Sequence, residues 1–142
     1  MKSAAGYSGT PLIKKLGIKP GQRICILDAP ERYGQAIGPL PARVEVLSRL
    51  GKLHSLDFIH YFTKQASQLQ QMFPKLKSAL NWNGSLWISW PKGSSKVPTD
   101  VNENLVREIG LAAGLVDVKI AAVDEIWSGL KFVFRREDRP VR

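Results

Sequence analysis

Short apolar runs alternate with segments of helical periodicity, and this alternation constrains the fold more than any other feature of the sequence. Residues 23–27 carry a continuous apolar run between turn-forming residues, which is typical of a central strand covered on both faces. Residues 43–47 predict a short strand and residues 56–62 a longer one. Residues 81–84 form a turn-like Asn-Trp-Asn-Gly cluster, and the β-rich residues 85–90 after it predict a further strand.

Helical spacing precedes and separates these strands. A short helix is predicted just after Pro11, over residues 12–16. Apolar residues recur at helical intervals from residue 66 to residue 80. Pro74 interrupts this segment, and a proline inside a helix removes a backbone hydrogen bond. We therefore expect a kink there, or two consecutive helices with Pro74 opening the second.

The C-terminal part of the chain predicts one more helix and a hairpin. Thr99 or Asp100 is the expected cap of the helix, whose apolar face continues to residue 112. Residues 116–126 and 130–136 then predict two strands. The connection between them, residues 127–129, is short enough for an antiparallel hairpin.

Strands that alternate with helices predict a three-layer α/β domain with a mostly parallel sheet and an antiparallel hairpin at its C-terminal edge. The chain has 142 residues, which is enough for one domain with a sizeable core. Residues 1–10 are interpreted as an N-terminal arm and residues 137–142 as a flexible tail.

The positive charge of the chain is concentrated in its first part. The net charge is +9, and residues 1–99 contain fourteen Lys and Arg against four acids, whereas residues 100–142 contain seven against eight. No acid occurs between Phe58 and Thr99. Such a run indicates either solvated helix faces and loops or a surface for an anionic small molecule, an acidic partner or nucleic acid.

The sequence also indicates a location and excludes several kinds of site. No segment has the length of uninterrupted apolar residues that a membrane span requires, and the first residues lack a signal-peptide pattern, so we expect a cytoplasmic protein without membrane contacts. One cysteine, Cys25, and two histidines, His54 and His60, predict no metal site. No nucleophile elbow is present, and no catalytic residue is assigned.

Two segments resemble the C-terminal half of Rossmann-like methyltransferases that use S-adenosylmethionine. Residues 80–90 and 114–119 carry this resemblance. A closer resemblance, to the bacterial domain of unknown function family 3052, covers nearly the whole chain; it is carried by residues 6–12, 15–21, 90–92, 97–100, 116–119 and 123–130. The first resemblance implies a shortened, methyltransferase-like version of the Rossmann-like fold, whereas the second implies no activity.

The turn after the first strand departs from the methyltransferase pattern. Cofactor-binding folds of this kind have a glycine-rich turn there, because the cofactor approaches the backbone too closely for a Cβ atom. This chain has Asp28-Ala29-Pro30 instead, and few residues lie between Asp28 and Leu56. We therefore expect a domain without a cofactor, with S-adenosylmethionine as the alternative.

A candidate ligand site follows from the expected sheet, since ligands of α/β sheets bind at the carboxyl ends of parallel strands. Hydroxyl and ammonium groups gather in the segments that follow these strands and suit a phosphate or carboxylate. The predicted ligand-binding residues are Asp28, Lys64, Trp90, Lys92, Ser94, Ser95, Lys96 and Thr99. The alternative is that the loop of residues 92–98 is merely solvated and that Trp90 and Trp127 cover the core.

These observations lead to three functional hypotheses. The first is a non-catalytic α/β domain that binds an anionic ligand or partner on a basic rim. The second, from the resemblance, is an S-adenosylmethionine-dependent methyltransferase with an atypical first loop. The third is a nucleic-acid-binding protein, although no recognisable nucleic-acid motif is present in the sequence.

Overall fold

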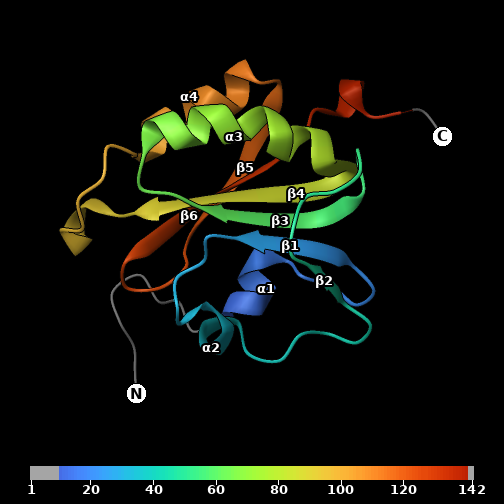
Figure 1. Cartoon of the computed structure of the whole chain (residues 1–142), viewed down its shortest axis with the longest axis horizontal. Coiled ribbons are helices and arrows are strands. Elements are labelled where there is room, and N and C mark those ends of the chain that lie inside the picture. The colour runs from blue at the N-terminus through green and yellow to red at the C-terminus, as the bar shows by residue number, and fades with distance from the viewer. Residues whose placement is uncertain (1–9, 141–142) are drawn as a thin grey trace.

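The computed structural model describes residues 10–140 and contains one six-stranded sheet (Figure 1). The strands are β1 (Arg23–Leu27), β2 (Glu45–Leu47), β3 (Leu56–Phe62), β4 (Leu80–Pro91), β5 (Leu115–Ala122) and β6 (Trp127–Phe134). Their order is β2-β1-β3-β4-β6-β5. Strands β2, β1, β3 and β4 are parallel, whereas β6 runs antiparallel to both β4 and β5. The predicted mostly parallel sheet with an antiparallel edge is confirmed.

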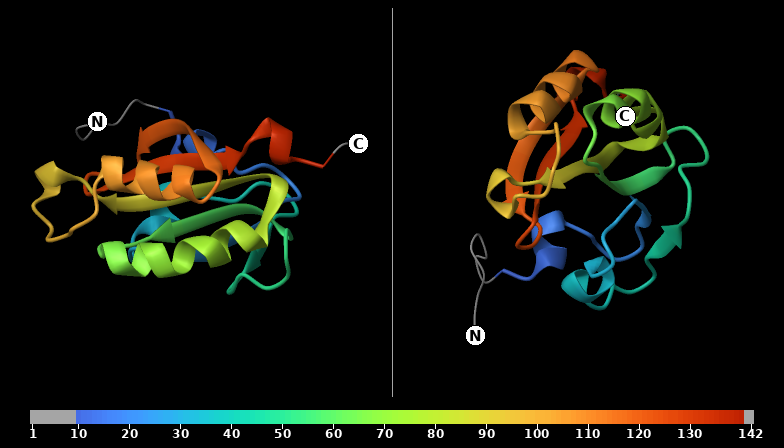
Figure 2. Two further views of the ribbon diagram at one scale, coloured as in Figure 1. Left: turned by 90° about the horizontal axis from the view of Figure 1, so that it is seen from above. Right: turned by 60° about the vertical axis from the view of Figure 1, so that its left-hand side comes forward.

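Helices cover both faces of this sheet, as Figures 1 and 2 show. One face carries α3 (Ala66–Ala79) and α4 (Glu103–Ala112), and the other carries α1 (Leu12–Leu16) and α2 (Tyr33–Ile37). Two short 3-10 helices, η1 (Gly93–Ser95) and η2 (Arg136–Asp138), complete the elements. The chain is thus the predicted three-layer, Rossmann-like arrangement.

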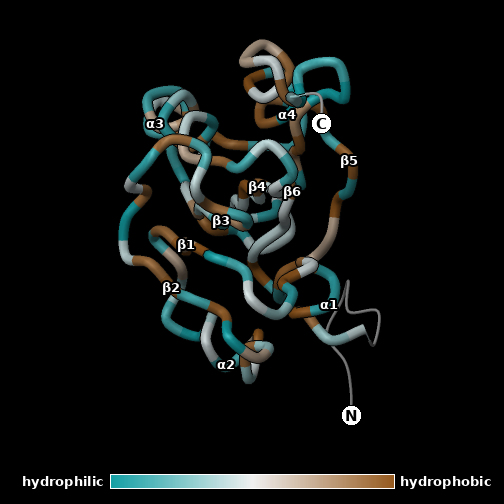
Figure 3. Tube along the Cα trace, turned by 90° about the vertical axis from the view of Figure 1, so that its right-hand side faces the viewer, coloured by the Kyte–Doolittle hydropathy of each residue, from teal (hydrophilic) through white to brown (hydrophobic). Residues whose placement is uncertain are grey.

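The core consists of two clusters that the sheet separates. The cluster beneath α3 and α4 includes Leu86 and Ile88 of β4, and the cluster beneath α1 and α2 includes Trp87. Trp87 therefore points opposite to its two neighbours, as the alternation of side chains along a strand predicts. Figure 3 shows hydrophobic stretches of the chain in β1 and β3, in the middle of the molecule. Strands β1 and β3 have the predicted bounds, because their apolar runs end at turn-forming residues.

The prediction that Pro74 opens a second helix is wrong. α3 is one continuous helix with Pro74 inside it. Pro74 and Gln70, the residue whose carbonyl loses its hydrogen-bond partner, are both exposed. Since the interruption lies on the solvent side of α3, water can bind that carbonyl, and the helix continues.

The predicted turn at residues 81–84 is also wrong, because these residues belong to β4. Pairing with β3 shifts register there: Leu56 pairs with Leu80, but Phe58 pairs with Ser85. The extra residues form an irregularity in the strand rather than a turn. Gly84 is buried at this point, and a Cβ atom on it would lie 2.9 Å from the carbonyl oxygen of Asp57. The glycine of this Asn-Gly sequence therefore allows β4 to approach the backbone of β3 closely.

Two boundaries in the C-terminal part differ from the prediction. Asn102, rather than Thr99 or Asp100, caps α4, and its side chain accepts a hydrogen bond from the backbone N–H of Leu105. The hairpin turn consists of residues 123–126, so the predicted turn residues 127–129 lie in β6. Asp124 Oδ1 accepts hydrogen bonds from two backbone N–H groups within this turn, which fixes its shape.

The predicted N-terminal arm lies outside the described residues, apart from Thr10. Near the other end, the guanidinium of Arg139 donates two hydrogen bonds to the carbonyl oxygen of Phe134, at 3.2 and 2.9 Å. The flexible tail at residues 137–142 stays a prediction. Among residues 10–140, no helix is long and apolar enough to cross a membrane.

Candidate functional site

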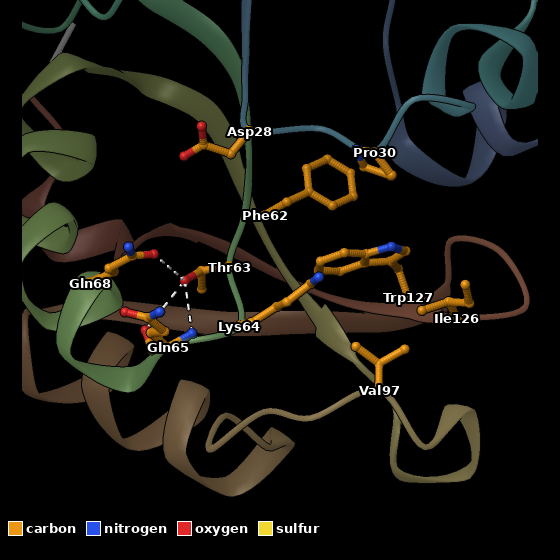
Figure 4. A pocket seen from close by; sticks show the side chains of 10 residues that line it. All are labelled: Asp28, Pro30, Phe62, Thr63, Lys64, Gln65, Gln68, Val97, Ile126 and Trp127. Carbon is orange, nitrogen blue, oxygen red and sulfur yellow. Dashed lines mark hydrogen bonds between the residues drawn. The ribbon is translucent and has the colours of Figure 1, made fainter.

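A cavity of about 510 Å³ opens at the carboxyl edge of the parallel strands. It lies between the end of β1, the end of β3, the loop after β4 and the hairpin turn before β6 (Figure 4). Its lining residues are Asp28, Pro30, Phe62, Thr63, Lys64, Gln65, Gln68, Val97, Ile126 and Trp127. This is the edge at which open α/β sheets bind their ligands, so the cavity is the candidate site.

Asp28 makes the sharp turn that leads out of β1. Its φ is 58°, in the left-handed region that residues other than glycine, asparagine and aspartate rarely adopt. The residue is exposed and lines the cavity. The chain therefore turns sharply after β1 without the glycine-rich sequence that such turns commonly have, and it places a carboxylate there.

Thr63 organises the polar side of the cavity. Its hydroxyl lies 3.2 Å from the carbonyl oxygen of Gln65 and 3.3 Å from Oε1 of Gln68, and it accepts a hydrogen bond from the backbone N–H of Gln65 (Figure 4). Thr63 is buried, whereas Lys64 and both glutamines are exposed. The Gln65 amide and the Lys64 ammonium group can thus turn toward a ligand from a fixed backbone, whereas Gln68 Oε1 accepts a hydrogen bond from Thr63.

The loop after β4 holds the backbone of residues 64–66 through two hydrogen bonds. Thr99 Oγ1 donates to the carbonyl oxygen of Lys64 at 2.7 Å, and Asp100 Oδ1 accepts from the backbone N–H of Ala66 at 2.7 Å. These two bonds join residues far apart in the sequence. They fix the segment that carries Lys64 at the rim of the cavity.

Aromatic rings form the apolar wall. Phe62 meets Trp127 edge to face, with ring centroids 5.2 Å apart and an interplanar angle of 82°. Trp127 is 7% exposed and comes from the first position of β6. Figure 4 shows the Lys64 side chain extending toward Trp127. The cavity therefore combines an apolar wall with a carboxylate and an ammonium group.

A buried hydrogen-bonded chain supports this wall from below. His60 stacks on Phe62 with centroids 4.1 Å apart; its Nδ1 lies 2.9 Å from the Tyr33 hydroxyl and its Nε2 lies 2.7 Å from Ser89 Oγ. All three residues are buried. Burial lowers the pKa of His60 to about 3, so the imidazole is neutral at physiological pH. His60 is therefore a hydrogen-bonded core residue.

The structure brings together only some of the predicted ligand-binding residues. Asp28 and Lys64 line the cavity. Trp90 does not, because it is buried on the opposite face of the sheet, in the core beneath α3 and α4. Trp127, in contrast, lies in the cavity wall.

The loop after β4 contributes less than expected. Ser95 Oγ donates to the carbonyl oxygen of Lys92 at 2.7 Å, so this hydroxyl and that of Thr99 shape the loop. Ser94 and Lys96 are exposed on or next to η1, which projects beyond the edge of the sheet in Figure 1. None of Lys92, Ser94, Ser95, Lys96 and Thr99 lines the cavity. A ligand role for these residues stays a prediction.

The cavity also includes residues that are not among the predicted ligand-binding residues. Thr63 and Gln65 lie between β3 and α3, and Gln68 lies in the first turn of α3. They carry no motif, so only their position after a parallel strand could have indicated them. In residues 10–140, no group of three or more His, Cys, Asp or Glu side chains is arranged to hold a metal ion.

Several solved structures with a similar fold are methyltransferases. A SAM-dependent methyltransferase from Aquifex aeolicus is 17% identical, with a TM-score of 0.54 over 85% of this chain and 86% of that one. Fibrillarin from Aeropyrum pernix with bound S-adenosyl-L-methionine is 14% identical, with a TM-score of 0.57 over 83% and 69%. Magnesium protoporphyrin IX methyltransferase from Synechocystis with bound SAH is 12% identical, with a TM-score of 0.53 over 87% and 78%.

These similarities support the methyltransferase-like fold that the sequence predicts. No protein-family model matches the chain, and no curated protein matches it in sequence. The resemblance to domain of unknown function family 3052 therefore stays a prediction.

The expectation of a domain without a cofactor needs correction. Two of the similar structures contain S-adenosylmethionine or SAH, its demethylated product. This finding counts against that expectation and in favour of its alternative, S-adenosylmethionine, because the chain shares the fold in which those molecules are bound.

Proposed function

We propose that this chain is an S-adenosylmethionine-dependent methyltransferase that binds its cofactor in the cavity between Asp28 and Trp127. One observation carries the proposal: in a methyltransferase-like fold, the cavity lies at the carboxyl ends of β1 and β3 and has a carboxylate, an ammonium group and an aromatic wall. The similar structures support this function over the non-catalytic domain that we expected first.

The residues present fit the chemistry of the cofactor. S-adenosylmethionine has an ammonium, a carboxylate, a sulfonium and an adenosine. Asp28 would bind the ammonium and Lys64 the carboxylate, through charge-assisted hydrogen bonds. Phe62 and Trp127 would supply apolar surface for the adenine ring. A volume of about 510 Å³ lies within the range of small-molecule sites.

When bound, the cofactor supplies an activated methyl group that moves to a nucleophilic atom of an acceptor, while the electron pair of the broken S–C bond stays on sulfur. The chain's own task is to hold and orient the reactants. The fixed backbone around Thr63 and the rigid wall of Phe62 on His60 suit that task. Val97 and Ile126 border the opening of the cavity from two different loops and would limit the access of water.

Calorimetric titration with S-adenosylmethionine and with SAH tests the binding step. We expect both molecules to bind. Asp28→Asn and Lys64→Gln should each weaken S-adenosylmethionine binding by about tenfold or more, because each removes one charge-assisted hydrogen bond. Glu108→Gln and Lys52→Gln are matched controls, since both residues are exposed and neither lines the cavity.

The absence of heat from either molecule at millimolar concentration would refute the proposal. Equal weakening by the control variants would assign the effect to net charge rather than to the cavity. Transfer is tested with S-adenosylmethionine that is radiolabelled in its methyl group, mixed with the protein, RNA and small-molecule fractions of a cell extract. Label in none of the three fractions would contradict methyl transfer.

A further inference from the structure

A second surface, away from the cavity, lies where the helix layer of α1 ends. Trp87 of β4, Lys131 of β6 and Lys119 of β5 are neighbours across three adjacent strands. The indole Nε1–H of Trp87 donates to the carbonyl oxygen of Leu16 at 3.0 Å, so α1 covers Trp87. Lys131 beside it is half-buried, and Lys119 on the edge strand is exposed. The two lysines therefore occupy the part of this face next to α1.

Backbone oxygens hold two ammonium groups at the end of α1. Lys119 Nζ donates to the carbonyl oxygen of Lys15 at 3.0 Å, and Lys15 Nζ donates to that of Ala122 at 3.4 Å. A Cβ atom on Gly17, just after α1, would lie 4.0 Å from Lys131 Nζ. Figure 3 shows β5 running toward α1 in agreement with these contacts. We call Lys15, Lys19, Lys119 and Lys131 the lysine face.

Carboxylates do not neutralise most of this charge. The ion pairs among residues 10–140 join Arg23 to Glu45 and Arg107 to Glu103 and Asp117, and none involves Lys19, Lys119 or Lys131. The pKa of Lys131 is lowered by burial and, further, by repulsion from Lys119 and Lys19. The ammonium groups are thus close enough to repel one another, and a bound anion would relieve this repulsion.

The composition of the lysine face indicates the kind of partner. Lysine is depleted from the interfaces between proteins, whereas interfaces with nucleic acid are strongly positive. The lysine face does not line the cavity of the candidate site. Its neighbouring ring, Trp87, is fully buried and offers no surface on which an unpaired base could stack. These features favour contacts to regularly spaced phosphates over contacts to bases.

We propose that the lysine face binds the phosphate backbone of a double-stranded nucleic acid without reading its sequence. Lys19, Lys119 and Lys131 each contact a phosphate, and Lys15 holds Ala122 and thereby the end of β5 in place. This inference is independent of methyl transfer, because it concerns a different surface and needs no cofactor.

The test is a fluorescence anisotropy titration of the whole protein, without cofactor, against short labelled duplexes of RNA and of DNA over a series of salt concentrations. Three phosphate contacts predict a slope of about −2.7 in a plot of log affinity against log salt. The triple variant Lys19→Gln/Lys119→Gln/Lys131→Gln should lose most of this slope, about one unit per lysine, and bind at least about tenfold more weakly at low salt.

The matched control is the triple variant Arg49→Gln/Lys52→Gln/Lys75→Gln, which removes the same charge from exposed positions elsewhere. It should keep nearly the full slope. If the half-buried Lys131→Gln change lowers the melting temperature, the double variant Lys19→Gln/Lys119→Gln replaces the triple one, with a loss of about two units expected.

Four results would overturn the proposal. They are no duplex binding at low salt, an equal loss of slope in the control variant, tighter binding of a single strand than of a duplex, and binding of poly-glutamate as tight as that of a duplex. The last result would assign the lysine face to an acidic polypeptide.

Discussion

The Tyr33 hydroxyl lies 2.9 Å from Nδ1 of His60 and joins α2 to the middle of the sheet. The other imidazole nitrogen lies 2.7 Å from Ser89 Oγ. Neutral imidazole has one N–H group and one acceptor nitrogen, and hydroxyl groups can serve both, so the buried ring is fully satisfied. The segment that follows β1 is thereby anchored to β3 and β4, beneath the wall of the candidate site.

We predict that Tyr33→Phe lowers the free energy of unfolding by about 1–3 kcal/mol, because it leaves one nitrogen of a buried imidazole without a partner. Urea denaturation measures the change. A double-mutant cycle with His60→Phe isolates the interaction, since Tyr33→Phe should cost much less in the His60→Phe background. Equal costs in both backgrounds would show that the hydroxyl and the imidazole are not coupled.

A second prediction concerns pH. The pKa of His60 falls from 6.5 to about 3 on folding because of burial. Between these values the unfolded chain binds a proton at His60 and the folded chain does not, so stability falls as pH falls through this window. The contribution of His60 is about 1.4 kcal/mol for each pH unit within the window.

Urea denaturation at a series of pH values checks this prediction. His60→Gln should have a shallower loss of stability below pH 6.5 than the unaltered chain. His54→Gln retains His60 and should follow the unaltered chain. If both variants follow the same pH profile as the unaltered chain, His60 is not the group responsible.

The third prediction concerns the close approach of β4 to β3. In Gly84→Ala the new methyl group would lie 2.9 Å from the carbonyl oxygen of Asp57 and 3.0 Å from that of Leu56, and backbone cannot yield as a flexible side chain can. We expect a loss of about 1–3 kcal/mol in unfolding free energy, typical of overpacking. Gly93 has open space around it, so Gly93→Ala should change the free energy of unfolding by no more than about 0.5 kcal/mol. Equal losses in both variants would remove the steric explanation.

The fourth prediction separates the two roles of Asp28. Its left-handed conformation is tolerated by Asp and Asn but strained for a β-branched residue. Asp28→Asn should therefore keep the melting temperature while it weakens cofactor binding. Asp28→Val should lose about 1–2 kcal/mol of stability as well, whereas Glu31→Val, at an exposed position three residues later, should not. Full stability in Asp28→Val would mean that the turn imposes no constraint.

Sequence patterns predicted the strands that lack exposed residues. No residue of β1 or β3 is exposed, so their bounds follow from composition. Residues 81–84 were misassigned, because Asn and Gly favour turns and strand irregularities for the same conformational reasons. The continuity of α3 through Pro74 was not predictable, because the exposure of Pro74, which makes the lost hydrogen bond tolerable, depends on how α3 packs.

The candidate site was predictable only in part. Asp28 and Lys64 follow parallel strands directly, so topology alone indicated them. Trp90 was expected at the rim, but its side chain points to the opposite core, since a strand changes face at every residue. Trp127 reaches the cavity because the hairpin turns at residues 123–126, and turn position within a hairpin depends on tertiary register.

The place of β6 in the sheet has a consequence for synthesis of the protein. β6 lies between β4 and β5, although it is the last of these six strands to be made, and within residues 10–140 β5 pairs with no other strand. A nascent chain that ends at Ile126 therefore contains β5 without its partner and leaves open the edge of β4 from Leu86 to Pro91. Such an open edge invites pairing with other chains, so ribosomes that stall before residue 127 would release a product prone to aggregation.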